Sequence, residues 1–583
     1  MKIDYIISET TKEATTAALK KVIEKAEKDI FGNFVVIVPE TKSIIIEKEL
    51  LKLSTNGALA NVFVYSFVRL VNRLGFVPQE KIVSKQTCVM LLRKIIYENF
   101  ANLKCYKKTA KTVGFAEKIY DTIQQFKSSN VSVDDLKLGL SKATKALKSK
   151  LEDIVLLYSE YENMIQNKYF DDCDKLNLLG TFANESDFVK DSEIFIVGFD
   201  NVTYEMTSVL KSLAQNAKSI TFASVYFQEN RKDKHIQSND LFKKFTHIGD
   251  ELNYAYSPVF VKGRHTGDFK NVKFNLYSTE KKAFESDGSI KVFEAKSRRQ
   301  EIDFIANQIL SEVKEGKRFK DIGLYLSNMS EFSELVKKCF DAYEIPYFVN
   351  DSHSVSNHVL ILFIKTCFEL ETSHLSVDKV LKFMASPFVK CLDFGLFENF
   401  VKETGVCYGG FLKDIEKNPA QDEEEFSKLD EMFKGFQEFY AEFSTKLKNA
   451  KNIRDYLQII NFLFEKFDVL NVLEEISAFE KENGFVILGE ITSGILKKCQ
   501  DFNLSVENFM GDIEVKTEEF LQIYLSGFDT VKMNLSPVSI DCVVVQDTAD
   551  GFYDIKTMFI MGAEDGVFPA KIQDSGIILD AEL

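Results

Sequence analysis

The first part of the chain, about 75 residues, alternates between short apolar runs and longer amphipathic stretches. Residues 5–7 predict a short strand, and the apolar run 34–38, closed by a proline, predicts a strand buried on both faces. Helical periodicity fills 10–28 between them. A helix at 43–53 and a strand at 62–67 continue the alternation. This order of elements predicts a parallel sheet built from strand–helix–strand units.

The next part of the chain, from residue 81 to about residue 177, is wholly helical in pattern. The helices expected there are 85–98, 109–128 and 143–167. Buried strands then return at 193–199 and 219–223, with a helix at 205–215 between them. A parallel α/β sheet interrupted by a helical insertion explains this order.

A second α/β unit follows residues 228–288, which are polar and irregular and are expected to form a connector with little core. Its expected strands are 290–295, 322–326, 345–349, 540–545 and 557–562, and its expected helices are 299–316 and 329–342. Residues 356–530 are almost entirely helical, which predicts a second large insertion. The sequence stops at Leu583, where more α/β structure is expected, so this unit is expected to be incomplete.

The fold class predicted by these patterns is α/β, with two parallel-sheet domains that each carry a large helical insertion. The expected boundaries are 1–80 and 180–227 for the first domain, 81–179 for its insertion, 228–288 for the connector, 289–355 and 532–583 for the second domain, and 356–531 for the second insertion. This layout resembles the paired RecA-like domains of superfamily-one helicases.

The charge balance restricts how the chain could bind nucleic acid. Its formal net charge is −15, so DNA contact requires a local basic groove. The longest uninterrupted apolar run, 359–364, is far shorter than the ~20 residues that span a bilayer. With no signal peptide in view, we expect a cytoplasmic protein that does not contact membranes.

The cysteines and histidines predict no metal site, because no Cys-x-x-Cys pair and no histidine ligand spacing occurs. Five cysteines lie in helical patterns and are expected to be small apolar core residues of a reduced protein. They are Cys88, Cys105, Cys339, Cys367 and Cys499.

The first strand is followed by a degenerate version of a phosphate-binding loop. In an intact Gly-x-x-x-x-Gly-Lys-Ser/Thr loop, backbone N–H groups wrap the phosphates and the lysine neutralises them. Here Ser8 and Glu13 hold the two glycine positions. Ala14 replaces the lysine, and Thr15 keeps the hydroxyl. Lys12 could substitute only from a shifted register, so nucleotide binding is expected to be lost.

A Mg²⁺-binding carboxylate should end a later strand of such a domain. The candidate is Asp200, which stands alone where an Asp-Glu pair is usual. The alternative is a loop aspartate that caps the following helix. The sequence therefore has the layout of a helicase without an evident motor.

Several segments together resemble AddB (RexB), the second subunit of the bacterial AddAB helicase–nuclease. They are 38–43, 47 with 49–50, 64–70, 196–199 with 203 and 205, 301–302 with 305–306 and 309, 319–322, 345–348 and 559–569. Their order and spacing extend over essentially the whole chain. The sharpest is 562–569, because related helicases place a similar glycine- and proline-containing turn there.

The resemblance implies a role in processing double-strand DNA ends for recombinational repair. AddB is usually an inactivated helicase that scans the 3′-ended strand for the Chi sequence, while an AddA-type partner translocates. The family's nuclease and its four-cysteine iron–sulfur cluster lie in a second half that this sequence does not include. Neither is carried over to it, and no cofactor is expected. Residues 547–551 also depart from the motif of an active helicase.

The family pattern also suggests residues that contact single-stranded DNA. The hydroxyls of Thr41 and Ser43 would bond a base edge or a phosphate. Phe67 would stack on an unpaired base, which is worth ~1–3 kcal/mol, with core packing as the alternative. Arg69 would contact phosphate or guanine, with a surface ion pair as the alternative.

Three functions therefore remain open at the level of the sequence. The first is a motor-inactive subunit that binds an AddA-type partner and both single-stranded and duplex-end DNA. The second is an active ATP-dependent helicase with a divergent phosphate loop. The third is a protein-interaction scaffold without DNA binding, which the negative charge would suit. Whether the chain is itself an enzyme stays undecided.

Overall fold

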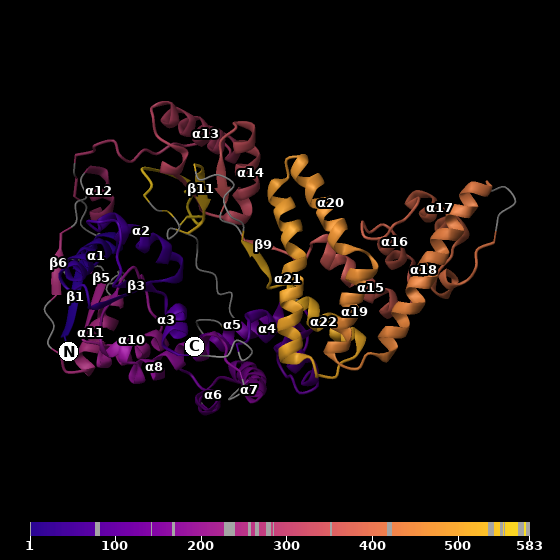
Figure 1. The fold of residues 1–583 in the computed structure, drawn as a ribbon, viewed down its shortest axis with the longest axis horizontal. Helices are drawn as coiled ribbons and strands as arrows, with labels where there is room; N and C mark the ends of the chain where they lie inside the picture. Colours follow the sequence, from indigo (N-terminus) through magenta and orange to yellow (C-terminus); the bar gives the residue numbers. More distant parts are fainter. Residues whose placement is uncertain are drawn as a thin grey trace.

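The computed structural model describes most of the chain and arranges it as two α/β domains beside a large helical body (Figure 1). The described residues are 2–75, 82–112, 114–141, 143–165, 169–226, 240–254, 258–262, 267–275, 282–283, 285–349, 352–416, 422–534, 541–548, 552, 554–568 and 577–578. The first α/β domain lies at one end of the long axis and the helices of the second insertion lie at the other.

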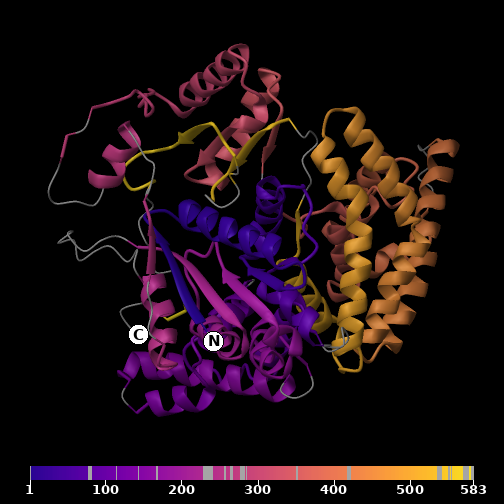
Figure 2. The same cartoon turned by 60° about the vertical axis from the view of Figure 1, so that its left-hand side comes forward.

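The first domain is built on a parallel six-stranded sheet in the order β3-β2-β4-β5-β1-β6. Its strands are β1 Lys2–Ser8, β2 Asn33–Ile37, β3 Val62–Tyr65, β4 Ser192–Ile196, β5 Ser219–Val225 and β6 Pro258–Val261. Its helices are α1 Thr11–Lys28, α2 Ser43–Leu53, α3 Phe67–Leu74, α8 Asp172–Glu185, α9 Asp187–Lys190, α10 Tyr204–Asn216 and α11 Asp240–Glu251. Helices cover both faces (Figure 2), which explains the uninterrupted apolar runs at 34–37 in β2 and 194–196 in β4.

The second domain is smaller and has a parallel sheet in the order β12-β7-β11-β8. Its strands are β7 Ile322–Leu326, β8 Tyr347–Val349, β11 Val543–Gln546 and β12 Thr557–Met561, and its helices are α13 Arg298–Lys314 and α14 Met329–Ala342. An antiparallel pair, β9 Ser352–Ser354 and β10 Lys532–Asn534, stands where the chain leaves this domain and returns to it. The predicted fold class, two parallel α/β sheets with helical insertions, is confirmed.

The two helical insertions, which are far apart in the sequence, share one hydrophobic core. The first contributes α4 Lys85–Glu98, α5 Phe115–Ser128, α6 Val133–Gly139 and α7 Lys145–Ile165. The second contributes α15 Val359–Thr372, α16 Val377–Met384, α17 Phe394–Thr404, α18 Glu423–Asn449, α19 Ile453–Lys466, α20 Val469–Glu482, α21 Val486–Met510 and α22 Thr517–Phe528. Thr87 Oγ1 of α4 lies 3.2 Å from Ser505 Oγ of α21. No helix among the described residues is both long enough and apolar enough to cross a membrane.

Residues 290–295, predicted as a strand, form no strand in the structure, and this prediction is wrong. Val292 is 95% exposed, and the ring of Phe293 stacks on Phe304 of α13 with 3.7 Å between centroids. Alternating side chains favour an extended backbone but do not supply a neighbouring strand. Here the aromatic ring packs against α13 instead, although Phe293 remains 46% exposed.

The range 228–288, predicted as a connector with little core, also differs from the structure. Residues 227–239 lie outside the described residues, but α11 buries Leu241, Phe245 and Ile248 in the core of the first domain. β6 adds a parallel edge strand beside β1, and α12 follows at Gly267–Asn275. A four-residue edge strand with exposed side chains has too little alternation to be recognised.

Of the cysteines expected in the core, Cys88, Cys339, Cys367 and Cys499 are buried. Cys105 is exposed, so that prediction is wrong. The reason is local: Cys105 lies in the non-helical loop after α4, not in a helix.

A buried ion cluster joins the first insertion to the first α/β domain. Nζ of Lys127 in α5 lies 2.7 Å from Asp171 Oδ2, 2.8 Å from Asp174 Oδ1 and 3.4 Å from Glu162 Oε1. Gln124 donates a further hydrogen bond to Asp171. Burial opposes the ionisation of Asp171, but Lys127 and the other donors hold its pKa below the ordinary value.

Glu205, near the start of α10, belongs to the same environment and is 6% exposed. Burial raises its pKa to about 7, and the charges of Asp171 and Asp174 add to the rise. The thiol of Cys173 opposes the rise by hydrogen bonding. The folded protein therefore binds this proton more tightly than the unfolded chain does.

Because its folded pKa is raised, Glu205 contributes its full stability below the ordinary pKa of 4.5 and loses it as the pH rises through about 7. Glutamine cannot ionise. The free energy of unfolding of Glu205→Gln, relative to that of the unmodified protein, is therefore expected to increase by about 2 kcal/mol when the pH rises from about 5 to about 8. Urea unfolding at the two pH values measures this. Exposed Glu185→Gln is the control, and an equal difference at both pH values would contradict the assignment.

Candidate nucleic-acid interface

Polar residues from three strand exits meet at the carboxyl edge of the first sheet. Lys42 follows β2, Asp200 follows β4, and Thr11 begins α1 after β1. Lys42 Nζ donates to the carbonyl of Gly198 over 2.7 Å and to Asp200 Oδ2 over 3.0 Å. Thr11 Oγ1 donates to Asp200 Oδ1 over 2.9 Å. The ion pair of Lys42 with Asp200 and the hydrogen bond from Thr11 therefore hold together the segments that follow β1, β2 and β4.

Asp200 does not cap the helix that follows it, although capping was the alternative expected from the sequence. The N-cap of α10 is Thr203, whose side chain accepts from the N–H of Met206. Asp200 instead accepts from the connections after β1 and β2. Its carboxylate is at the end of a core strand, but both oxygens are already engaged.

The positions of the degenerate phosphate loop form a short turn rather than an open loop. β1 ends at Ser8 and α1 begins at Thr11, so Glu13 is already helical. The Glu13 carboxylate accepts from Ser8 Oγ over 2.9 Å and from Thr10 Oγ1 over 3.0 Å. An acidic group thus stands at the helix N-terminus, where a bound phosphate would otherwise be favoured.

The remaining positions of that loop follow from the same helix. Ala14 is 1% exposed and packs in the core beneath α1. A lysine at this position would be directed into apolar side chains. Thr15 is half-buried, and Lys12 is exposed. The sequence did carry a signal for this arrangement, because Thr10-x-x-Glu13 is a typical helix-start pattern.

Two of the four residues expected to contact DNA are exposed near one another. Thr41 is exposed in the 3₁₀ turn Glu40–Lys42. Arg69 of α3 places Nε 3.1 Å from Glu40 Oε1, and its Nη1 lies 3.9 Å from Glu47 Oε1. The arginine is therefore in the surface ion pair that was its alternative. The ion pair is exposed, so another anion can easily replace the Glu40 carboxylate as the partner of Arg69.

The other two expected residues are buried. Ser43 is 1% exposed, and its hydroxyl donates to the carbonyl of Glu40 over 3.0 Å. Phe67 is 6% exposed, with its ring centroid 5.6 Å from that of Phe199. Phe67 thus occupies the core-packing position that was its alternative. DNA binding by the four residues stays a prediction.

One feature of α3 was not recognised in the sequence. Arg73 lies one turn after Arg69, is exposed, and holds its guanidinium 4.7 Å from the ring centroid of Phe188. Asn72 is also exposed beside them. Two arginines on one helix face are notable in a chain whose basic residues are mostly lysine. Arginine is suited to phosphate because of its planar fork of donors.

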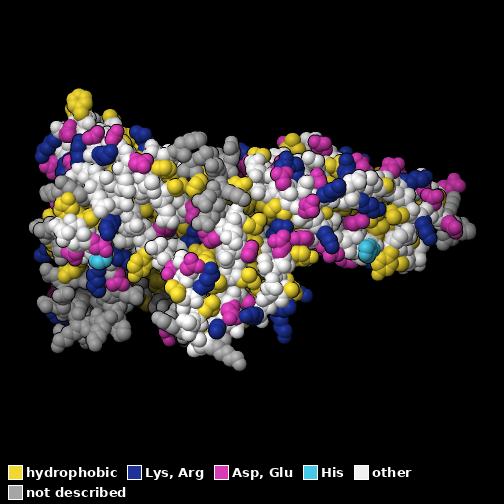
Figure 3. Space-filling view, turned by 90° about the horizontal axis from the view of Figure 1, so that it is seen from below, with side chains coloured by type: hydrophobic (Ala, Val, Ile, Leu, Met, Phe, Trp, Pro, Cys, Tyr) yellow, Lys and Arg dark blue, Asp and Glu magenta, His cyan; other side chains and the backbone are white. Residues whose placement is uncertain are grey.

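The face of the molecule seen from below (Figure 3) gives no comparable signal. Figure 3 shows acidic and basic side chains interspersed over the face viewed from below, without a broad field of one sign. In the part of the chain that the structure describes, no cluster of His, Cys, Asp and Glu is arranged to hold a metal ion. Local geometry must therefore identify any nucleic-acid contact.

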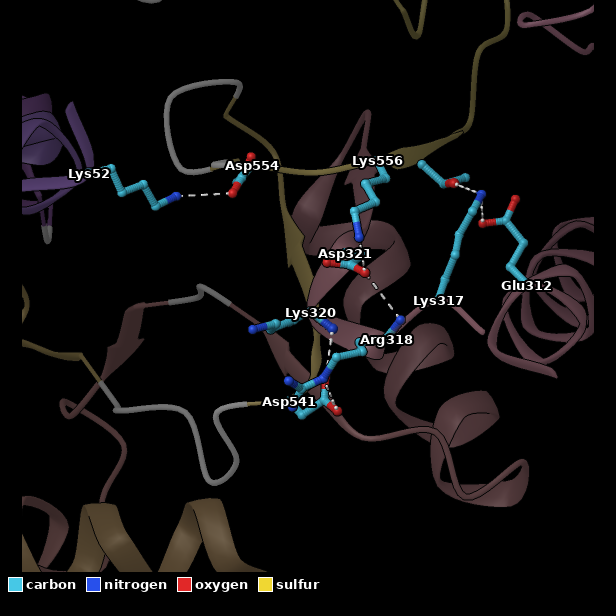
Figure 4. A network of polar contacts seen from close by, with 10 residues as sticks. Lys52, Glu312, Lys317, Arg318, Lys320, Asp321, Asp541, Asp554 and Lys556 are labelled. Carbon is cyan, nitrogen blue, oxygen red and sulfur yellow. Dashed lines mark hydrogen bonds and ion pairs between the residues drawn. The ribbon is translucent and has the colours of Figure 1, made fainter. Parts of the chain in front are cut away.

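A second polar network lies at the amino ends of the strands of the second domain (Figure 4). Asp321 accepts from Lys556 Nζ over 2.7 Å, and Asp541 accepts from Arg318 Nε over 3.2 Å. One further pair, Lys52 with Asp554 at 3.2 Å, links α2 to the second domain. These contacts tie connections together on the edge opposite to the strand exits, so we assign them a structural role.

Sequence similarity to known proteins agrees with the architecture. Residues 5–258 match the sequence model of the family described as ADDB, N-terminal. The whole chain is 27% identical to the B subunit of the ATP-dependent helicase/deoxyribonuclease of Alkaliphilus metalliredigens, covering 54% of that protein. It is 26% identical over its whole length to the same subunit of Clostridium kluyveri, again covering 54%.

The corresponding protein of Bacillus pumilus is 24% identical over 99% of this chain, which covers 53% of that relative. The chain thus spans about half the length of the curated relatives it matches. The last residue of the expected turn 562–569 and part of the expected motif 547–551 lie outside the described residues. The predicted resemblance to AddB is nevertheless confirmed, and this chain is related to the B subunits of the ATP-dependent helicase/deoxyribonucleases.

Proposed function

We propose that this chain is the DNA-binding, motor-inactive part of a helicase–nuclease subunit that processes double-strand DNA ends. An AddA-type partner would supply translocation, and this chain would scan the 3′-ended strand. The relatives are named as B subunits of an ATP-dependent helicase/deoxyribonuclease, which supports the assignment to such an assembly.

The observation that carries the motor-inactive assignment is the Glu13 carboxylate at the start of α1. It accepts hydrogen bonds from Ser8 and Thr10 in the turn where a nucleotide phosphate would lie. A second negative charge placed there would be repelled, and Ala14 supplies no compensating cation. Saturable binding of Mg-ATP to the isolated chain would contradict this part of the proposal.

The support for DNA binding is the exposed face of α3 beside Thr41. Arg69 and Arg73 present guanidinium groups there, and Arg69 is held by the exposed carboxylates of Glu40 and Glu47. A DNA phosphate would replace Glu40 as the partner of Arg69. The carboxylate keeps the arginine in position until DNA arrives.

Arg69→Ala is expected to weaken binding of a single-stranded oligonucleotide by about 10-fold, with a salt slope smaller by about 1, because one phosphate contact is lost. Glu40→Gln is expected to tighten binding, because the competing anion is removed. Fluorescence anisotropy of the complex with an AddA-type partner, over a salt series, measures both. Arg454→Ala in α19 is the matched control.

Opposite effects of the two substitutions would support the proposal, since a merely structural ion pair would be weakened by either change. Equal weakening by Arg69→Ala and Glu40→Gln would contradict it. Absence of DNA binding by the unmodified complex would favour the scaffold without DNA binding.

A further inference from the structure

The loop between α4 and α5 stands out in an acidic protein. Residues 99–116 contain four lysines and neither aspartate nor glutamate. We refer to residues 99–112 as the lysine loop. It belongs to the first helical insertion and not to the sheet edge discussed above.

The lysine loop is fixed by hydrogen bonds at its middle and near its end. Asp153 of α7 is 1% exposed, and its carboxylate accepts the backbone N–H groups of Lys104, Cys105 and Tyr106 over 2.8, 2.8 and 2.9 Å. Nη1 of Arg93 in α4 donates to the carbonyl of Ala110 over 2.7 Å. A loop held in this way loses little conformational entropy when it binds a partner.

Three of its lysines present unneutralised charge. Lys104 is paired with Glu152 at 2.7 Å, but Lys107, Lys108 and Lys111 are exposed and make no ion pair with a described residue. Nζ of Lys107 and Nζ of Lys111 lie 5.7 and 5.1 Å from the centroid of the same Phe100 ring. Both ammonium groups are thus near one aromatic ring, and an anion bound to the lysine loop would neutralise positive charge that no carboxylate of the described residues neutralises.

The chemistry of the lysine loop favours phosphate over bases. Ammonium groups bind phosphate as point charges and read no base edge. The rings of the loop are already engaged. Phe100 contacts the ammonium groups of Lys107 and Lys111, and Tyr106 is 9% exposed with its hydroxyl bonded to the carbonyl of Ile577. Single-strand binding relies on open rings for stacking. A duplex, whose bases are stacked inside, needs none.

We propose that the lysine loop binds the phosphate backbone of duplex DNA, at a place separate from the α3 face. This inference rests on the proposed function, because it assumes a DNA-processing subunit. In this proposal, the DNA that is still double-stranded contacts the first helical insertion, before its strands separate. Lys107, Lys108 and Lys111 each contribute one phosphate contact, and Asp153 holds the backbone that carries them.

The test uses the triple substitution Lys107→Ala, Lys108→Ala and Lys111→Ala in the full chain, assembled with an AddA-type partner. The probe is a fluorescent blunt-ended duplex titrated between about 50 and 200 mM salt. We expect about 10-fold or greater weakening at low salt and a slope of log K against log salt smaller by about 2 to 3. Binding of a single-stranded oligonucleotide is expected to be unchanged.

A matched control removes the same charge elsewhere. Lys413, Lys448 and Lys481 are exposed in the second insertion, and their triple alanine variant is expected to bind duplex normally. Equal duplex affinity and salt slope for the lysine-loop variant and this control would overturn the inference. Loss of single-strand binding to the same degree as duplex binding would also overturn it, as would loss of partner assembly alone. If the unmodified complex binds no DNA, the proposed function itself fails, which is a distinct result.

Discussion

Replacing Lys127 by methionine is expected to destabilise the protein by about 3–5 kcal/mol. The side chain of Lys127 is 9% exposed and is the cation among Asp171, Asp174 and Glu162, while the side chain of Asp171 is 0% exposed. Methionine keeps the volume of the chain but leaves these carboxylates without their shared counter-charge. Breaking one side of a buried ion pair is much more costly than removing the pair.

Urea unfolding followed by circular dichroism measures the loss. Lys118→Met, at an exposed position of the same helix, is the control and is expected to change stability by less than about 0.5 kcal/mol. Adding Asp171→Asn to Lys127→Met is expected to recover part of the loss, because one uncompensated charge is removed. A loss of similar size in both single variants would show that α5 is sensitive to any substitution and not to the buried charge.

Elements with strong local signals were predictable from the sequence. The bounds of α2, α4 and α14 agree with the predicted ranges 43–53, 85–98 and 329–342. Each has apolar residues at helical spacing, and α4 also has a clear start. For α4 the start is Ser84, whose side chain accepts from the N–H of Thr87. Periodicity and capping are properties of neighbouring residues, so one sequence is enough to reveal them.

Contacts between distant segments were not predictable in this way. The shared core of the insertions joins apolar residues of α4 and α21 that no local pattern connects, and the contact of Thr87 with Ser505 links the same two helices. The same reason applies to the candidate site. The sequence places Phe67 directly after a strand but does not show whether its ring is exposed, and in the structure the distant Phe199 packs against it. The loss of the phosphate-loop lysine at Ala14 was visible, whereas the role of Glu13 required the hydrogen bonds of the folded turn.

The turn after β12 joins two segments of the AddB resemblance. The N–H of Gly562 donates to Glu301 Oε1 of α13 over 2.8 Å. Gly562 has φ +75°, a left-handed conformation that favours glycine. A Cβ at this position would overlap Ser327 Oγ and lie 2.7 Å from a ring carbon of Phe332. Backbone conformation and close packing therefore both require glycine.

Gly562→Ala is expected to destabilise the second domain by about 3 kcal/mol, the sum of left-handed strain and forced displacement of a packed ring. Hydrogen exchange of the β7 and β12 amides should then accelerate by about 100-fold. Gly405→Ala is the control, because φ there is +66° and nothing lies within 4 Å of the added Cβ. It should cost about 1 kcal/mol locally and leave that exchange unchanged. Unchanged exchange in Gly562→Ala would mean that the turn relaxes without disturbing the sheet, and the tight packing inferred around β12 would be wrong.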